Sequence, residues 1–465
     1  MEMSKLKKKI TIPHTFTIIF LLIVVIAILT WIIPSGEFQR INVDGRMVVK
    51  PGTYRQVAPN PQGIQDVFKA PIDGFIDAAE VVGFVLLVGG AFGIVNKTGA
   101  IESGINHTVK KLNKLQVLII PVSMILFGLG GSTFGMNEET LPFYMIFIPL
   151  MMNLGYDSLT AISTVFIGSG TGVIASTINP FSVGIAQALA NITPGSGIGY
   201  RSLIFVALMA LSISFVMLHA HKVKRDPKKS IVYDYDQKNK GEFIVEDSSI
   251  KQFTKKEGIV LSIFIGGMCM MVYGVLNLDW YIPQIAMIFC MIGIFSGIFG
   301  GLKQDEIVDS FLNGASDLIS AALAIALARG IVIVAQNGHI IDTLLNYSAD
   351  LLSRLPKFIF INLSFALESV LAFLIPSSSG LASLTIPVLS PLSDLVGVSS
   401  QLIITAYQFG TGIINLITPT SGVLMGALAF AKIPWSKWLR YIAPLIGGII
   451  VVCIAFLTIG LYIGF

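Results

Sequence analysis

Charged residues are scarce in this chain of 465 residues. They make up 12% of it, while 54% of the residues are hydrophobic. Soluble domains carry roughly 25% charged residues. No aqueous fold could bury so much apolar surface, so the composition excludes a soluble protein and indicates a chain that crosses a lipid bilayer several times.

The sequence also lacks the patterns of metal, redox, catalytic and nucleic-acid sites. Its three cysteines, Cys269, Cys290 and Cys453, lie in apolar runs without ligand spacing, which predicts packing residues. It has no HExxH motif, no GxSxG with triad partners and no Cys/His cluster, so we expect no enzyme, metal or cofactor. The net charge of +4 comes mainly from a few loops, and no nucleic-acid partner is expected.

Long apolar runs predict about nine full membrane spans. Two runs, 157–190 and 399–430, are interrupted by Gly-Thr-Gly and then a proline, which predicts helices broken within the membrane. Seven others can cross alone, because about 20 apolar residues span the hydrocarbon. These are 13–34, about 75–95, 201–220, 257–277, 281–301, about 315–336 and 441–463.

Two further regions, 116–154 and 357–396, predict re-entrant hairpins. Each contains two apolar arms of about 15 residues around a centre rich in Gly, Ser and Thr, and each arm is too short to cross about 30 Å of hydrocarbon. The first centre runs from Gly131 to Thr140 and the second from Pro376 to Gly380. The predicted fold is an all-α polytopic membrane protein.

The two halves of the chain repeat one another. Residues recur 240 positions later (314 − 74 = 240): Gly74, Asp77, Gly90, Ile101 and Glu102 return as Gly314, Asp317, Gly330, Ile341 and Asp342. One extra span between the halves would turn the second one upside down, which predicts inverted repeats. The predicted organisation is a first repeat at 1–221, a linker at 222–256, the extra span at 257–277 and a second repeat at 278–465.

Basic residues set the expected orientation, because cytoplasmic loops carry an excess of Lys and Arg. Lys5–Lys9 precede a first run that is too long for a signal sequence, whose apolar region has about 7–15 residues. We therefore expect an uncleaved first span, a cytoplasmic N-terminus and a cytoplasmic linker.

The hairpin tips and helix breaks predict a binding site. Unpaired backbone groups cost several kcal/mol in hydrocarbon, so four such breaks should converge on one cavity. Their hydroxyl and amide groups suit a small polar ligand or a cation, while helix capping is the alternative reading. The candidate residues are Ser132, Thr133, Asn137, Glu138 and Glu139, Ser377, Ser378 and Ser379, and Thr171, Asn179, Thr411, Asn415 and Thr418.

Glu138 and Glu139 have no acidic counterpart in the second half, where Ser383 and Leu384 take their positions. A carboxylate at membrane depth can bind a substrate amine, a proton or a sodium ion. The alternative is a glutamate that neutralises its own helix N-terminus.

Other charged residues also lie in apolar surroundings. Arg329 and Glu368 are at depths where a charge is costly unless it is paired, and a buried pair between them is one expectation. Asp77 and Asp317 recur symmetrically, which favours a structural role for both.

Four motifs resemble a known family of carriers. They are the opening Trp31-Ile-Ile-Pro-Ser-Gly-Glu-Phe38, Gly89–Val95, Gly135-Met-Asn-Glu-Glu139 and Phe409-Gly-Thr-Gly412. The chain resembles the YfcC-type branch of the DcuC-like anaerobic dicarboxylate carrier family, in the ion transporter superfamily. The resemblance implies a bacterial inner-membrane carrier, with some members assigned to four-carbon dicarboxylates and others resembling arginine/ornithine exchangers.

The expected function is secondary active transport, by a carrier or antiporter that works by alternating access. The acidic pair favours small amino acids, including basic ones, and a four-carbon dicarboxylate or other carboxylate is the alternative. A channel is disfavoured, because paired hairpins with broken helices are typical of carriers. We expect the hairpins and broken helices to move against a scaffold of continuous helices. The expected partners are the substrate, the bilayer and a second copy in a homodimer, with sodium or a proton left open as coupling ion.

Overall fold

The structure is a computed structural model that describes residues 15–43, 46–101, 103–104, 113–193, 195–239, 241, 254–278, 280 and 282–465. Most of these residues are helical. Eight of the described helices are long and apolar enough to cross a membrane, or nine if the bent pair at 304–337 counts as one span. The chain is an all-α polytopic membrane protein, as predicted, with two small β-ribbons outside the helices. Basic Lys5–Lys9 lie outside the described residues.

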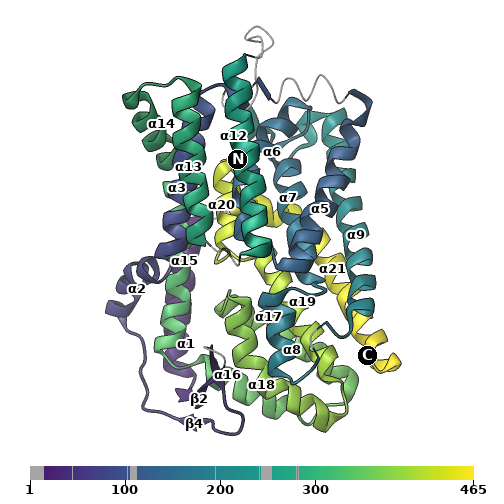
Figure 1. The fold of residues 1–465 in the computed structure, drawn as a ribbon. Coiled ribbons are helices and arrows are strands. Elements are labelled where there is room, and N and C mark those ends of the chain that lie inside the picture. Colours follow the sequence, from purple (N-terminus) through teal and green to yellow (C-terminus); the bar gives the residue numbers. More distant parts are fainter. Residues whose placement is uncertain are drawn as a thin grey trace, which may run out of the picture.

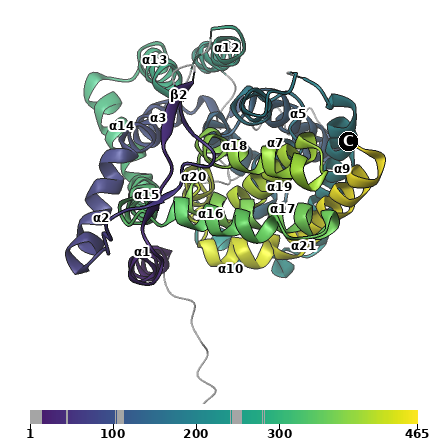
Figure 2. The same ribbon diagram turned by 90° about the horizontal axis from the view of Figure 1, so that it is seen from below.

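Two helix bundles stand side by side in both views (Figures 1 and 2). The bundle that we call the scaffold bundle lies on the left of Figure 1 and packs through α3 and α15. It consists of α1 (Thr15–Ile32), α2 (Ile64–Asp77), α3 (Ala79–Lys97), α12 (Lys255–Asn277), α13 (Ile282–Gly300), α14 (Gln304–Asp317) and α15 (Ile319–Asn337).

The other bundle, here called the hairpin bundle, contains both predicted hairpins and both predicted broken helices. Helices α7 and α19 pack against one another at its centre. It consists of α5 (Ile119–Phe134), α6 (Leu141–Asn153), α7 (Ser158–Ile174), α8 (Ile185–Leu189), α9 (Ile198–Arg225), α16 (Ile341–Leu352), α17 (Lys357–Leu374), α18 (Ser378–Val396), α19 (Ser400–Ile417), α20 (Gly422–Phe430) and α21 (Trp435–Ile463).

Repeated glycines join the helices of the scaffold bundle. Gly74 of α2 lies so close to the backbone around Gly330 of α15 that a β-carbon would clash there. Gly314 of α14 lies equally close to Gly89 and Gly93 of α3. Small residues at a crossing let helix backbones approach closely in a membrane. The short helix of each half therefore packs on the long helix of the other half.

Both hairpins end within the hairpin bundle. The first is α5 and α6, and the second is α17 and α18, whose arms have 18 and 19 residues. At 1.5 Å per residue these two arms reach about 27–29 Å, longer than the arms of about 15 residues that we predicted. Arm length alone therefore does not distinguish the second hairpin from a pair of full spans.

The two broken helices are interrupted near prolines. A short π-helical turn at Pro180–Gly184, η3, separates α7 from α8, while α19 ends at Ile417 before Pro419 and α20 begins at Gly422. Proline lacks the N–H that a continuing helix needs, so the breaks near the prolines follow from the sequence. The predicted interruption at Gly-Thr-Gly is wrong, because both motifs are helical within α7 and α19. Helix α20 then packs against α15 and α6, between the two bundles.

Two short β-ribbons, which were not predicted, cover one end of the molecule near α16 and α18. Strand β1 (Gly36–Glu37) pairs with β4 (Arg55–Gln56), and β2 (Arg40–Val43) pairs with β3 (Arg46–Val49). Asp342 of α16 anchors the ribbons, because its carboxylate accepts from the backbone N–H of Phe38 and from Arg40, both at 2.8 Å.

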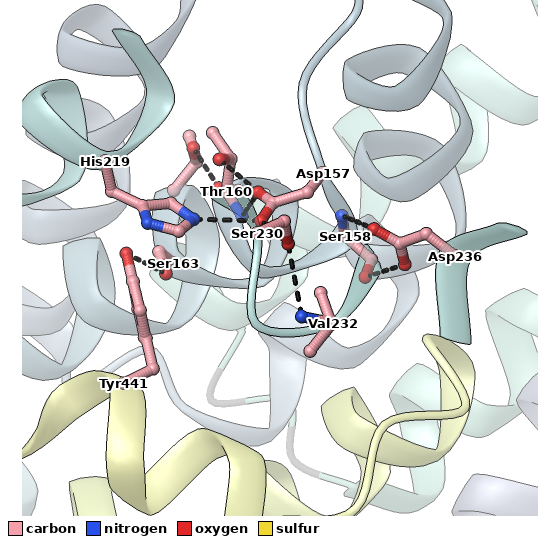
Figure 3. A network of polar contacts seen from close by, with 10 residues as sticks. Asp157, Ser158, Thr160, Ser163, His219, Ser230, Val232, Asp236 and Tyr441 are labelled. Carbon is pink, nitrogen blue, oxygen red and sulfur yellow. Dashed lines mark hydrogen bonds and ion pairs between the residues drawn. The ribbon is translucent and has the colours of Figure 1, made fainter. Parts of the chain in front are cut away.

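The start of α7 is held by the linker between the halves (Figure 3). Asp157 caps α7 by accepting from the N–H of Thr160 at 2.9 Å. It also accepts from His219 of α9 at 2.9 Å and from Ser230 of the linker at 2.6 Å. Burial alone would raise the pKa of Asp157, but these bonds and the charge of His219 lower it below its usual value.

The linker continues into α10 (Tyr233–Lys238), which carries a second carboxylate to the same place. Asp236 accepts from both the backbone N–H and the hydroxyl of Ser158. Burial, together with the nearby charge of Asp157, raises the pKa of Asp236 to about 6. The described part of the linker thus packs against the hairpin bundle and is not simply a solvent-exposed connection.

Candidate substrate site

A cavity of about 300 Å³ lies where the two bundles meet, and both hairpin tips and both helix breaks reach it. This volume is at the lower end for small-molecule pockets. We call it the central cavity. Its polar lining residues are Asp77, Asn137, Glu138, Glu139, Asn179, Arg329, Ser377, Ser378, Ser379, Asn415, Thr420 and Ser421.

The first tip turns at Gly135, which has a positive φ of 75°. This left-handed conformation suits glycine, because a β-carbon would be strained there. A β-carbon would also meet the side chain of Asn179, at 2.8 Å from its amide atoms. Beyond the turn, the N–H of Asn137 donates to the carboxylate of Glu139 at 2.9 Å. The turn therefore presents an acidic pair to the cavity, with Glu139 only 8% exposed.

The second tip carries hydroxyl groups and no acid. Ser377 caps α18 by accepting from the N–H of Gly380 at 3.2 Å. The hydroxyl of Tyr407, on α19, donates to the carbonyl of Ser378 at 2.6 Å. The start of α18 is thereby tied to the second broken helix.

Three helix N-termini meet at the cavity. Their capping residues Asn179, Ser377 and Ser421 all line it, and their side chains accept from the N–H groups of Phe181, Gly380 and Leu424. A helix N-terminus carries a partial positive charge, and half-helices in transporters use it to hold anionic substrate groups.

Arg329 forms an ion pair with Asp77, across α15 and α2. The predicted pair of Arg329 with Glu368 is therefore wrong. Asp77, for which we predicted a structural role, also lines the cavity. Together with Glu138 and Glu139, the described lining residues include three carboxylates and one guanidinium. Because Arg329 is paired with Asp77, the acidic groups in excess are Glu138 and Glu139, which favour a cationic group as ligand, while the helix N-termini favour an anionic one.

Eight of the thirteen predicted site residues line the central cavity. They are Asn137, Glu138, Glu139, Asn179, Ser377, Ser378, Ser379 and Asn415. Two charged residues that line it, Asp77 and Arg329, are not among the predicted site residues, although each lies near or inside an apolar run of the sequence.

The other five predicted residues donate or share hydrogen bonds within the bundle. Ser132 and Thr171 join neighbouring helical segments, through Thr177 at 3.1 Å and Ser212 at 2.8 Å. The remaining three bond within their own segment: Thr133 to Leu129, Thr411 to Tyr407 and Thr418 to Thr420. In this conformation they brace the tips and breaks rather than line the cavity.

Comparison with known sequences identifies the family. The sequence pattern of the family described as C4-dicarboxylate anaerobic carrier matches residues 12–462. The chain belongs to this family. Membership makes it a membrane transporter and not an enzyme, as predicted.

Two curated relatives cover nearly the whole chain. One, described as a putative basic amino acid antiporter YfcC of Escherichia coli, is 33% identical, with 96% of this chain and 95% of that protein covered. The other is an uncharacterized protein of Haemophilus influenzae, 32% identical, with 97% of each chain covered.

Two solved structures show a distant likeness in fold. The YdaH transporter of Alcanivorax borkumensis matches with a TM-score of 0.44 and 15% identity, over 97% of this chain and 99% of that one. MtrF of Neisseria gonorrhoeae matches with a TM-score of 0.42 and 16% identity, over 97% and 96%.

Proposed function

We propose that this transporter carries small amino acids, basic ones in particular, as a secondary active carrier or antiporter. The observation that supports this most is the pairing of opposite preferences in one cavity. The carboxyl groups of Glu138 and Glu139 line the same cavity as three helix N-termini of a kind that attracts anions. An amino acid carries both an ammonium and a carboxylate, so it satisfies both kinds of group.

The excess of carboxylates favours a cargo with an additional positive charge. A charge-assisted hydrogen bond contributes about 1.5–3 kcal/mol, so a second cationic group gains substantially from Glu138 or Glu139. The relative described as a putative basic amino acid antiporter is consistent with this reading.

A four-carbon dicarboxylate is the second candidate. Arg329 and the three helix N-termini favour it, and the family description names this cargo. Its two negative charges would have to enter a cavity that Glu138 and Glu139 already make acidic, and like charges at close range repel in a medium of low dielectric constant. This repulsion ranks the dicarboxylate below an amino acid.

Alternating access is the proposed mechanism. The central cavity lies between the bundles, so a shift of the hairpin bundle against the scaffold bundle would change the side from which it opens. The second tip borders another cavity of about 420 Å³, lined by Gly380 and Ser383 and by the ribbon residues Glu37 and Arg40. Movement of this tip would join or separate the two cavities.

The setting that we propose is a bacterial inner membrane, with the N-terminus and the linker in the cytoplasm and two copies in a homodimer. The Lys and Arg residues at the end of α9, Lys222, Lys224 and Arg225, support the orientation.

Counterflow tests the proposed cargo. Liposomes that contain the purified protein are preloaded with one unlabelled compound, and uptake of the same labelled compound is measured for a panel of amino acids and dicarboxylates. We expect stimulation by arginine, ornithine or lysine and none by succinate or fumarate. Stimulation by dicarboxylates alone would contradict the amino acid proposal, and protein-free liposomes give the background.

A further inference from the structure

Glu368, on α17, is a buried carboxyl group without a hydrogen-bond partner. Its side chain is 0% exposed, and neither carboxyl oxygen has a donor or an ion-pair partner within the described residues. It does not line the central cavity. Most buried polar groups are hydrogen-bonded, so an orphaned carboxyl group in a hairpin arm needs an explanation.

The polar side chains nearest to Glu368 are occupied elsewhere. Thr385 of α18 lies near it but donates to the carbonyl of Leu381 at 3.1 Å. Tyr407 of α19 also lies near it and donates to Ser378 of the second tip at 2.6 Å.

No cation compensates Glu368 among the described residues of the other helices that contact α17. Arg329 of α15 is paired with Asp77. On α16, Asp342 binds Arg40 and Asp350 binds Arg354, both at the ends of the helix. The basic residues of α21 lie in its first two turns, where Lys437 stacks on Tyr235. Glu368 thus has only neutral polar groups around it.

An ionised carboxylate in such a place would lack both water and a counter-charge, at a cost of several kcal/mol. Glu368 is therefore protonated in this conformation. It can release its proton only when the helices around it separate enough to admit water or a donor. Since Tyr407 holds the second tip and lies beside Glu368, that movement and the position of the tip are connected.

We propose that Glu368 is a proton-binding site that couples proton movement to the opening of the second tip. The carboxyl group takes one proton from water on one side, carries it as the neutral acid while buried, and releases it as the carboxylate is hydrated on the other side. This inference rests on the proposed carrier function and names the proton as its coupling ion.

Proton-driven uptake and counterflow, measured in the same liposomes, distinguish a failure of the proton-binding proposal from a failure of the proposed carrier function. Counterflow needs no net release of protons, so Glu368→Gln, a permanent mimic of the neutral acid, should retain it. Uptake driven by a gradient of one pH unit should reach up to about tenfold accumulation in the wild type, since a tenfold ratio corresponds to 1.4 kcal/mol. The variant should show no accumulation, and a pH dye inside the liposomes should report no proton movement.

Asp350→Asn is the matched control. This exposed carboxylate of α16 pairs with Arg354, so the variant should keep full proton coupling.

Tyr407→Phe provides a second variant, in which we expect counterflow to persist and proton-driven uptake to slow at least threefold. If Glu368→Gln does not fold, the wild type still decides: substrate uptake without proton movement in either direction would overturn the proposal. Accumulation by Glu368→Gln at the wild-type level would do the same. Absence of counterflow with every amino acid would instead refute the proposed function.

Discussion

The two hairpin tips meet at one cavity but differ in chemistry and in attachment. The first tip is acidic and is fastened to the first broken helix, through Ser132 and Thr177 and through Ser169 and the carbonyl of Met136. The second tip offers only hydroxyl groups and is tied to α19 by Tyr407. The first tip therefore fits a wall that is fixed within the hairpin bundle and recognises the cargo, and the second fits a gate that can move relative to that bundle.

Replacing the acids of the first tip should have the largest effect. Glu138→Gln and Glu139→Gln each remove a charge that would pair with the cargo's cationic group, so the KM for a basic amino acid should rise about 10- to 140-fold, from a loss of about 1.5–3 kcal/mol. Ser379→Ala in the second tip should raise KM by less than about threefold. Initial rates of labelled uptake measure both, and equal effects at the two tips would contradict the distinction.

The glycines of the two tips, Gly135 in the turn of the first and Gly380 in the first turn of α18, give a second comparison. Gly135→Ala places a β-carbon in a left-handed turn and against Asn179, and should destabilise the protein by about 1–2 kcal/mol. Gly380→Ala should be tolerated, because it lies in a helix and the nearest atom would be the Ser377 hydroxyl at 3.3 Å. Thermal unfolding in detergent measures the difference. A larger loss for Gly380→Ala would show that the second tip, not the first, is rigidly packed.

The hydrogen bonds that hold the two tips, from Ser132 in the first and from Tyr407 in the second, should differ in their effect on transport. Ser132→Ala removes the buried hydrogen bonds of this hydroxyl with Ala175 and Thr177 and should lower stability by at least about 1 kcal/mol while leaving the cargo affinity unchanged. Tyr407→Phe should instead change the fraction of protein with an open gate. Reaction rates of single cysteines introduced at Ser378, with and without Tyr407→Phe, measure this opening. Unchanged rates would indicate that Tyr407 does not hold the gate.

The smallest effect concerns the helices behind the tips. Helix α7 is capped by Asp157, which the linker holds, whereas α19 is capped by Ser399, which bonds locally. Because docking raises the pKa of Asp236 to about 6, docking of the linker should strengthen as the pH falls from 7 toward 4 and weaken as the pH rises through about 6. The lowered pKa of Asp157 has the opposite effect: ionised Asp157 strengthens docking, and this contribution is lost only when the pH falls below the usual pKa range of an aspartate.

Hydrogen exchange over 230–238, corrected for intrinsic rates, should therefore be slower at pH 5 than at pH 7.5. Asp236→Asn should remove this dependence, while exchange in α19 should show little change with pH in either protein. Faster exchange at pH 5 would mean that protonation undocks the linker.

Much of this architecture could be predicted because hydrophobic length and helix breakers act locally. The run 13–34 leads to α1, and Pro180 and Pro419 lead to breaks close to those found, whereas the Gly-Thr-Gly motifs at 170–172 and 410–412 lie inside α7 and α19. The partner of Arg329 could not be predicted, since it depends on how two bundles pack. The same holds for the five hydroxyl residues that brace the tips, because a hydroxyl that caps and a hydroxyl that binds look alike in sequence.

The most direct test of the central claim compares arginine with citrulline, which has nearly the same shape but no charge on its side chain. In counterflow, the wild type should prefer arginine by at least about tenfold, and Glu138→Gln or Glu139→Gln should reduce this preference toward equality while citrulline uptake persists. A preference for arginine that survives in both variants would contradict the claim that the acidic first tip recognises a cationic cargo.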